Sequence, residues 1–554
     1  MQLRHGSYRQ TSACPAHTDS IENGHPPQSK RLPWLMSALL ISVTALSGCL
    51  AEGDVSGTSA QKSVTSRIGG GSTGSTGGST APRTGALIGN TNLQLPAVSA
   101  CTPEFQAVGH EHSLWPQTDF GLPTVAGQSK TWNHPAGRGY SVRVTKVADA
   151  SSAASMGATS YLHRIPEYSQ HDAFSADGHY LTSHGTTSRA LYDGRNYNNI
   201  RVIYNGGARM SDWNWHPIID RYAFYFDVLN ERIYRYDADA DTHTVLFDFQ
   251  ANPVTVNGQS FSNLGTTDNA NAMGGQGSIT PDGSEVAVIL TGGGNGAVLH
   301  LNLDNQTVEG SVFFPGKDSS AELDVATITP DGQYLLVLGD FDNLYGTSFS
   351  KKQLYAYDTD NLDRNNERLI LGRQGHFDLG INGNGDAVMV SVAYAPASGW
   401  AGRTTDSGVG LVSGVNVYNF SNHTYTHLLE RELWGNAGAP GNHISMSLDG
   451  SGVAVLSSYQ GSHPNSNTFA LNNATVAIDI DTGDVAWLGW DESANNGTQS
   501  AGSGIGGYYA QPHTSIVQDV EYADGSRSWK WAWGSDNRSA GSAPELFVGE
   551  LVCN

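Results

Sequence analysis

The sequence lacks the short motifs that mark several common enzyme classes. It contains no Walker loop, no His-Glu-x-x-His zinc motif, no cysteine cluster and no Gly-x-Ser-x-Gly elbow after a predicted strand. Basic residues are also scarce, with 30 Lys and Arg against 52 Asp and Glu and a net charge of −22. Nucleic-acid binding depends on lysine and arginine at phosphates, so no nucleic-acid partner is expected. An acidic surface still permits an anionic substrate, provided that a local cation or metal lines the cleft.

Charged residues make up only 15% of the 554-residue chain, whereas 66 residues are glycine. A chain of this length with 38% hydrophobic residues can bury a substantial core. The many glycines and the low charge favour a turn-rich β architecture over a helix bundle.

Long hydrophobic runs are rare, and the run near the amino end is too short for a comfortable membrane span. It lies in SKRLPWLMSALLISVTALSGC, the pattern of a bacterial lipoprotein signal. We therefore expect residues 1–48 to be a signal region and Cys49 to carry lipid, the only expected membrane contact. Leu50, in place of an aspartate, favours an outer-membrane lipoprotein at the cell surface or in the periplasm. A cleaved signal without lipid, giving a secreted protein, is the alternative.

The segment after Cys49 has no apolar periodicity. Residues 49–100 include GGGSTGSTGGSTAPRTG, and a run of Gly, Ser and Thr cannot form a core. We expect a flexible linker that holds a globular domain away from the membrane.

Cysteine is rare, with four residues in the whole chain. Cys14 lies within the signal region and Cys49 is the predicted lipid site, which leaves Cys101 and Cys553 near the two ends of the predicted domain. An exported chain meets an oxidising compartment, so we expect a disulfide between them. Two free thiols are the alternative.

One hairpin pattern recurs along the rest of the chain. AFSADGHYLTSH, SITPDGSEVAVIL, TITPDGQYLLVLG, GINGNGDAVMVSV and SMSLDGSGVAVLS each join two alternating strands through an Asp-Gly or Asn-Gly turn. Third strands such as QLYAYDTDN follow, and their terminal aspartates are expected to cap turns. Seven such units, starting near residues 170, 212, 276, 324, 375, 442 and 512, predict an all-β, seven-bladed β-propeller over residues 101–554. Residues 101 to about 160, including YSVRVTKV, are expected to supply the outer strands that close the ring.

The first hairpin places two histidines opposite each other. If Asp177 and Gly178 form its turn, residues whose numbers sum to 355 are cross-strand partners, and His171 then faces His184. Imidazoles so placed suit proton transfer or metal binding, although a single histidine at a strand start is more often structural.

The same register position recurs in other units, and the innermost strands of a propeller line its central channel. We therefore expect the side chains at this position to converge on one end of the channel. They are Gln276 in the third unit, His443 in the sixth and His513 in the seventh, and His376 opens the fifth unit nearby, where the NGNG turn leaves the count ambiguous.

We call this end of the channel the histidine face, and the opposite end, where the Asp-Gly turns lie, the turn face. Connections on the histidine face are long, including AYAPASGWAGRTTDSG and DESANNGTQSAGSGIGGYYAQPH. Long irregular loops on a rigid scaffold commonly carry binding residues. Four loop aromatics can stack on sugar rings: Trp400, Tyr459, Tyr508 and Tyr509.

The order of motifs resembles a known family. YSVRVTKV, YSQHDAFSADGHYL, DWNWHPIIDRYAFYFD, GNHISMS, QPHTSI, WAWGSDN and LFVGEL together resemble the seven-bladed propeller polysaccharide lyases of the ulvan lyase type and, more distantly, the oligogalacturonate lyases. The resemblance covers residues 125 to 552, approximately. It implies β-elimination of a uronic-acid-containing anionic polysaccharide, with ulvan as the first candidate.

Such a lyase neutralises the uronate carboxylate, removes the C5 proton with a base and protonates the O4 leaving group. The resemblance to ulvan lyases implies two spaced histidines of the first blade, followed by a tyrosine and an arginine. His163 and His184, 21 positions apart, match the histidines, with His171 between them. Tyr225 is the expected tyrosine, with Tyr222 as the alternative.

The family's arginine has no clear match in this sequence. Arg232 is our candidate for catalysis and Arg209 for substrate binding, although either can be a solvated charge. The manganese site of oligogalacturonate lyases implies another solution, a divalent zinc, manganese or calcium ion at the carboxylate. Its expected ligands are His376, His443 and His513, with Gln511 or Gln276 as further candidates.

A non-catalytic function is the alternative. Propellers with Asp-Gly hairpins also resemble periplasmic adaptor proteins, so a monomeric lipoprotein could bind glycans or other envelope proteins. The histidine register discriminates between the two functions, because a binding module has little need of His171 opposite His184.

Overall fold

The computed structural model describes most of the predicted propeller region. The described residues are 103–107, 121–148, 171–183, 188–265, 279–318, 322–339, 353–371, 376–393, 414–430, 441–459, 474–490, 514–515, 518–522, 527–535 and 545–553. The chain divides into two compact units, Met1–Ala81 and Pro82–Asn554, and every described residue belongs to the second. Within this part, no helix is long and apolar enough to cross a membrane. The predicted signal region, the linker and Cys49 lie outside the described residues.

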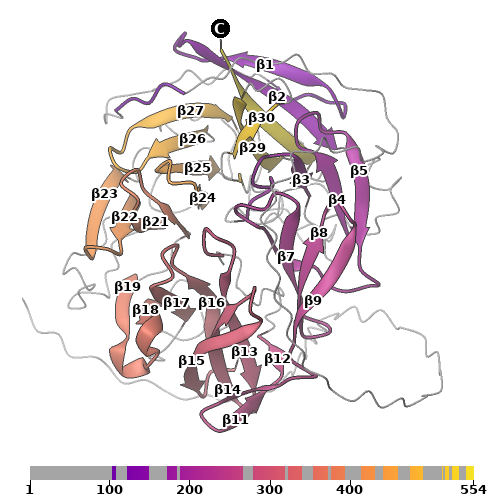
Figure 1. Cartoon of the computed structure of the whole chain (residues 1–554). Coiled ribbons are helices and arrows are strands. Elements are labelled where there is room, and N and C mark those ends of the chain that lie inside the picture. Colours follow the sequence, from indigo (N-terminus) through magenta and orange to yellow (C-terminus); the bar gives the residue numbers. More distant parts are fainter. Residues whose placement is uncertain are drawn as a thin grey trace, which may run out of the picture. The chain divides into compact units, whose positions relative to one another are not determined.

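In the described part of the chain, seven antiparallel sheets follow one another around a ring, and one separate hairpin lies beside the third sheet (Figure 1). Each sheet is one blade, which confirms the predicted seven-bladed β-propeller. Blade one contains β3 (Tyr180–Thr182), β4 (Ser188–Asp193) and β5 (Asn199–Tyr204). Blade two contains β6 (Ser211–Trp215), β7 (Tyr222–Asp227), β8 (Arg232–Asp237) and β9 (Thr242–Asp248). The separate hairpin is β10 (Val254–Val256) and β11 (Gln259–Phe261).

The third to sixth sheets have four strands each. Blade three contains β12 (Asn263–Leu264), β13 (Glu285–Gly292), β14 (Asn295–Asn302) and β15 (Thr307–Pro315). Blade four contains β16 (Leu323–Ile328), β17 (Tyr334–Gly339), β18 (Gln353–Asp358) and β19 (Arg368–Leu371), with 3-10 turns η2 (Thr359–Asn361) and η3 (Arg364–Asn366). Blade five contains β20 (Phe377–Ile381), β21 (Ala387–Ala393), β22 (Gly414–Asn419) and β23 (Thr424–Glu430). Blade six contains β24 (Gly441–Met446), β25 (Val453–Tyr459), β26 (Ala474–Asp479) and β27 (Val485–Trp490).

Blade seven joins the two ends of the described chain. Its strand order is β28 (Gln518–Glu521), β29 (Arg527–Ser535), β30 (Glu545–Cys553), β2 (Tyr140–Ala148) and β1 (Ser129–Asn133). YSVRVTKV thus forms β2 and closes the ring, as predicted. Cys553 ends β30 opposite Tyr140 and is disulfide-bonded. Cys101 lies outside the described residues, so its pairing with Cys553 stays a prediction.

The turns between first and second strands differ in type from the predicted two-residue turns. In blade three, Gly283 has a φ of 76° and donates its N–H to Thr280 O at 2.7 Å, while Asp282 keeps a negative φ. Thr280 Oγ1 donates to Asp282 Oδ1 at 2.7 Å and accepts the N–H of Glu285 at 3.0 Å. The loop therefore has four residues with glycine in the left-handed position. Register is unchanged, because the longer loop is centred on the same two residues.

Blade three begins earlier than the sequence indicated. Residues 266–278 lie outside the described residues, Ile279 forms an isolated bridge with Val286, and β12 pairs Asn263 with Thr291. A two-residue strand has too few residues to show alternation, so no sequence pattern revealed it.

Both sides of a central strand are buried between neighbouring blades. Val286, Val288 and Leu290 of β13 pack with side chains of blade two, whereas Ala287 and Ile289 pack with those of blade four. Successive side chains of a strand point to opposite sides, so these strands are continuously apolar. Polar side chains are therefore concentrated at the strand ends, on the two faces of the ring.

Candidate functional site

The hairpin of blade one has the register predicted from its sequence. Phe174 and Leu181, whose numbers sum to 355, form an antiparallel bridge. Thr182 N–H donates to Ala173 O at 2.9 Å in the same register. His171 precedes this bridge and is only 1% exposed. His184 lies outside the described residues, so its pairing with His171 stays a prediction.

Two histidines of the predicted register do come together. The rings of His376, just before β20, and His443, in β24, stack with centroids 4.6 Å apart and planes 17° apart. Val392 N–H donates to His376 O at 2.7 Å, which holds this residue against β21. His443 is fully buried and lies opposite Ser457 of β25. Imidazole side chains can carry a proton near neutral pH and can ligate metal ions, so the pair is a candidate for either role.

Buried hydroxyl groups are gathered at the same face. Within the described residues, four serine and threonine hydroxyl oxygens on side chains that are at most 2% exposed make no hydrogen bond, those of Ser391, Ser457, Ser458 and Thr514. The three serines lie near the ends of the second strands β21 and β25, and Thr514 precedes the first strand β28. All four therefore lie toward the histidine face. Buried polar groups in proteins are seldom left unpaired, so this set indicates a place built for a polar ligand or ordered water.

The groups at the start of blade one are electrically neutral or close to it. Burial and, to a smaller degree, the charge of Arg189 lower the pKa of His171 to about 3. Burial and the charge of Asp449 raise the pKa of Asp172 to about 7. An imidazole with so low a pKa stays neutral and is a weak base, whereas a carboxyl group with a pKa near 7 can exchange a proton at neutral pH.

Asp378 of β20 is a second buried carboxyl group in this region. Burial raises its pKa well above the ordinary value and the charge of Asp172 adds to that, despite hydrogen bonds from the N–H groups of Met446 and Leu379 at 2.7 and 2.8 Å.

Sequence reasoning missed a buried arginine beside His171. Arg189 of β4 is 1% exposed, and its Nη2 donates to Met210 O at 2.6 Å. Its guanidinium lies 5.1 Å from the ring centroid of Trp213. An arginine inside the apolar strand SRALYD is the signal that could have found it, because arginine is seldom fully buried without a specific role.

Tyr225, the expected tyrosine, lies in the core of blade two. Its ring is fully buried and stacks between Trp213 and Tyr234, with centroids 5.7 and 5.1 Å away. Its hydroxyl accepts from Asn205 Nδ2 at 2.6 Å and bonds to His243 Nδ1 at 2.9 Å. Burial raises the pKa of Tyr225, so the phenol stays protonated. We therefore assign it no proton-abstracting role.

The other predicted residues of blade two have separate positions. Arg232 begins β8, where its Nε donates to Asp248 Oδ2 at 2.8 Å in an ion pair of the outer strands. Arg209 precedes β6, and its backbone N–H donates to Asp227 Oδ1 at 3.0 Å. Tyr222 begins β7, at the turn face, which is the wrong end for the histidines.

Of the remaining predicted site residues, the structure describes Tyr459. It is the last residue of β25, opposite Gly441. His163, His184, Gln276, Trp400, Tyr508, Tyr509, Gln511 and His513 lie outside the described residues.

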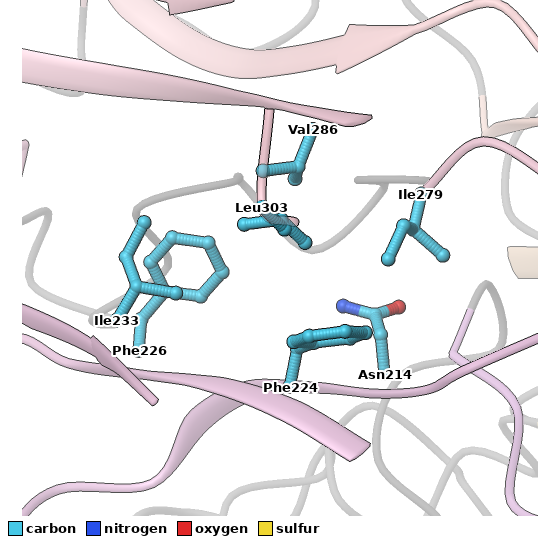
Figure 2. A pocket seen from close by; sticks show the side chains of 7 residues that line it. All are labelled: Asn214, Phe224, Phe226, Ile233, Ile279, Val286 and Leu303. Carbon is cyan, nitrogen blue, oxygen red and sulfur yellow. The ribbon is translucent and has the colours of Figure 1, made fainter. Parts of the chain in front are cut away.

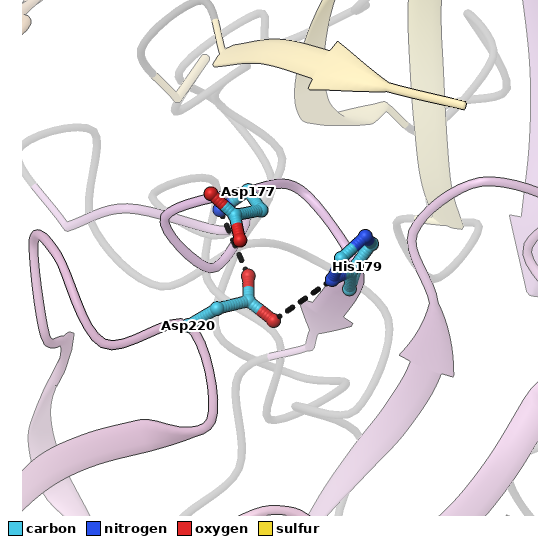
Figure 3. Close-up of side chains that lie close together, drawn as sticks. All are labelled: Asp177, His179 and Asp220. Carbon is cyan, nitrogen blue, oxygen red and sulfur yellow. Dashed lines mark hydrogen bonds and ion pairs between the residues drawn. The ribbon is translucent and has the colours of Figure 1, made fainter. Parts of the chain in front are cut away.

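A separate cluster on the turn face was not predicted from the sequence. Asp177 and His179 come from the hairpin of blade one, and Asp220 approaches them from the loop before β7 (Figure 3). One ligand atom from each residue lies within 4.8 Å of the others, a spacing that can hold a divalent cation. His179, directly after an Asp-Gly pair, was the available signal.

Hydrogen bonds already account for Asp220. Its Oδ1 accepts from Ser175 Oγ at 2.5 Å and Asp177 N at 2.8 Å, and its Oδ2 bonds to His179 Nδ1 at 3.2 Å. Burial alone would raise the pKa of Asp220, but these bonds outweigh it and lower the pKa to about 2. The cluster thus joins blade one to blade two without needing a metal ion.

One small pocket lies between blades two and three. Figure 2 shows Asn214 and six apolar side chains facing it: Phe224, Phe226, Ile233, Ile279, Val286 and Leu303. An apolar lining of this kind belongs to core packing and offers no group for catalysis.

The comparisons with known proteins bear on the fold of this chain and not on its function. No protein-family model matches the chain, and no curated protein matches it. An oligogalacturonate lyase from Vibrio parahaemolyticus aligns with a TM-score of 0.45 and 10% identity, over 77% of this chain and 97% of the other. The Pan2 WD40 domain from Neurospora crassa has a TM-score of 0.36 and 12% identity, over 70% and 89%. TolB from Acinetobacter baumannii has a TM-score of 0.28 and 14% identity, over 68% of this chain and 77% of the other. We transfer no function from these likenesses.

Proposed function

We propose that this protein is a polysaccharide lyase that cleaves a uronic-acid-containing anionic polysaccharide, ulvan first among the candidates, by β-elimination. The supporting observation is the composition of the histidine face, where the His376–His443 pair and buried hydroxyls without partners lie at the same strand ends. β-Elimination needs an acid, a base and a cation at the carboxylate, and neither a nucleophile nor an organic cofactor. The absence of nucleophile and phosphate motifs from the sequence agrees with this chemistry.

Proton transfer is assigned to the histidines of blade one. Burial lowers the pKa of His171 to about 3, so its imidazole stays neutral and can orient the group that accepts the C5 proton. His184 is the proposed partner, and His163 is the third member from the sequence comparison. Asp172, with a pKa of about 7, can pass protons between this set and the channel.

Neutralisation of the substrate carboxylate has two proposed sources. Arg189 is a cation close to His171 and would lower the energy of the enolate-like transition state through its charge. His376 and His443, with His513, could instead hold a divalent ion that supplies the same stabilisation. The two stacked rings fit a shared metal ion in residue type, since imidazole ligates zinc and manganese.

The test is ultraviolet absorbance of the unsaturated uronate product. We would incubate purified protein with ulvan, polygalacturonate, alginate and glycosaminoglycans, with and without a chelator. A rising signal on one glycan supports the lyase and identifies its substrate class, and chelator sensitivity favours the metal over Arg189. A folded protein that binds a glycan without producing the signal would replace the proposal with the binding-module function.

Export and anchoring complete the proposal. We propose that Cys49 carries lipid and places the propeller at the outer membrane. Labelling cells with a fatty-acid analogue should mark the wild-type protein and leave Cys49→Ala unlabelled and released from membranes. Equal labelling of both proteins would contradict the anchor.

A further inference from the structure

The ring closes through a strand from the amino-terminal side of the propeller. β2 pairs with β30 in blade seven, where Arg143 lies opposite Glu550, and β29 pairs with the other edge of β30, where Lys530 lies opposite Glu550 (Figure 1). The three side chains thus form one row across three strands, which we call the closure row. We propose that the closure row selects the register in which β2 closes the ring.

The row is buried and held by specific contacts. Arg143, Glu550 and Lys530 are 7%, 1% and 0% exposed. Arg143 donates to Glu550 Oε2 from Nε at 3.0 Å and also from Nη2, and Tyr522 donates its hydroxyl to Glu550 Oε1. Both carboxylate oxygens of Glu550 are therefore occupied, one of them by the closing strand.

Lys530 connects the same row to blade one. Its Nζ donates to Gly194 O at 3.0 Å and to Arg195 O at 3.3 Å. The rings of Tyr197 and Tyr522 lie 4.7 and 4.8 Å from the ammonium group. Because the first blade receives these bonds, the row lies at the seam where the last blade meets the first.

Hydrophobic burial can reject a shift of β2 by one residue. Val142 and Val144 are both fully buried, and a one-residue shift would turn them to the side of the row and Arg143 into the apolar cluster. A shift by two residues keeps every side chain on its own side, so apolar packing discriminates against it weakly.

The closure row rejects the two-residue shift. In that register Glu550 would lie opposite Ser141 or Thr145, because the native pairs are Arg143 with Glu550 and Thr145 with Val548. The carboxylate would then be buried without its guanidinium partner. A buried charge without its partner is far more costly than a mismatch between apolar side chains.

The experiment traps the register with cysteines in the full chain. Thr145→Cys with Val548→Cys reports the native register, and Thr145→Cys with Leu546→Cys reports the register shifted by two residues. Each pair is placed in the wild-type row and in a neutral row with Arg143→Met, Glu550→Leu and Lys530→Met, and cross-linked peptides are identified by mass spectrometry.

We expect the wild-type row to give the native cross-link almost exclusively and the neutral row to raise the shifted cross-link at least about tenfold. The matched control is Arg138→Met with Glu104→Leu, which removes an ion pair of 3.2 Å between side chains that are 42% and 47% exposed. This control should leave the shifted cross-link unchanged. A neutral row that gives only the native cross-link would overturn the proposal.

A second variant covers the case in which the neutral row does not fold. Glu550→Gln preserves the shape of the side chain and removes its charge. Amide hydrogen exchange in β2 should then become at least about tenfold faster, with β13 and β17 unchanged. Exchange in β2 equal to that of the wild type would also overturn the proposal.

Discussion

Strand ends and their loops form both faces of the ring, but the polar side chains of the two faces differ in their hydrogen bonding. On the turn face, Asp220 receives three hydrogen bonds, and Thr280 and Asp282 bond to each other across their loop. On the histidine face, the buried hydroxyls of Ser457 and Thr514 have no hydrogen-bond partner in the part of the chain that the structure describes. Buried polar groups that make hydrogen bonds stabilise the fold. Burying a polar group without a partner costs free energy, so such groups point to a place where a ligand or water can bind.

The difference teaches where a propeller of this kind can place chemistry. The turn face consists of short loops whose polar side chains hydrogen-bond within the loop and stabilise each glycine turn. On the histidine face, the rings of His376 and His443 stack on each other beside buried hydroxyls that make no hydrogen bond among the described residues. A cluster of titratable groups alone is therefore a poor guide, because the Asp177–His179–Asp220 cluster is explained by its own hydrogen bonds.

The largest expected effect is on the histidine face. His184→Ala should lower turnover by at least about a hundredfold, the scale of losing a general acid or base. The free energy of unfolding should change little. Turnover would be followed by uronate absorbance and stability by chemical denaturation. Near-full activity would move the proposed chemistry to other residues.

The reverse pattern is expected on the turn face. Asp220→Asn removes a charged acceptor from Ser175, Asp177 and His179, and should cost about 2 kcal/mol of stability. Activity at a temperature well below the unfolding midpoint should be retained. Asp304→Asn, a change at an exposed turn aspartate, is the matched control and should cost almost nothing. A large loss of activity in stable Asp220→Asn protein would mean that the two faces are coupled.

The acid dependence of stability provides a second test of Asp220. Its pKa falls from 3.8 in the unfolded chain to about 2 in the folded protein, so the folded state favours the carboxylate. This effect contributes about 2 kcal/mol to the free energy of unfolding. The contribution is fully present above about pH 4 and is lost as the pH falls through about 2. Denaturation curves from pH 5 to pH 2 should show a decline in the wild type that is smaller in Asp220→Asn. Parallel curves would contradict this assignment.

The smallest effects compare two buried serines directly. Ser175 Oγ donates to Asp220 and accepts the N–H of Tyr180 at 3.0 Å, so Ser175→Ala should cost about 1 to 2 kcal/mol. Ser457 Oγ has no hydrogen-bond partner, and Ser457→Ala should change stability by less than about 0.5 kcal/mol. If the substrate hydrogen-bonds to the Ser457 hydroxyl, KM should rise several-fold in Ser457→Ala and stay unchanged in Ser175→Ala. Equal stability losses would remove the contrast between the faces.

Features that depend on neighbouring residues in the chain were predictable. Repeated Asp-Gly turns and alternating strands led to seven blades, to the register of Phe174 with Leu181 and to β2 as a closing strand. The start of blade three was wrong, because β12 is separated from the hairpin and carries no pattern of its own. The two-residue turns were wrong as well, since a four-residue loop centred on the same pair gives the same strand register.

The candidate site was predictable only in part. His376 and His443 lie together, as expected for residues near the starts of innermost strands around one channel. The burial of Tyr225 between two aromatic rings was not predictable from its place near a strand end, because blade packing decides which side of a strand is core. Arg189 was missed for the same reason, since only its contacts with Met210 and Trp213 distinguish it from a surface arginine.

By itself, the sequence determined the number of blades and the strand register of the first hairpin, because both follow from the spacing of residues around the repeated turns. Only the tertiary structure decided which polar groups are satisfied. Ser175 and Ser457 are both buried serines of blade hairpins, yet Ser175 is bonded to Asp220 of the next blade, whereas Ser457 has no hydrogen-bond partner among the described residues. That distinction depends on which residues of distant segments are brought within hydrogen-bonding distance when the ring closes.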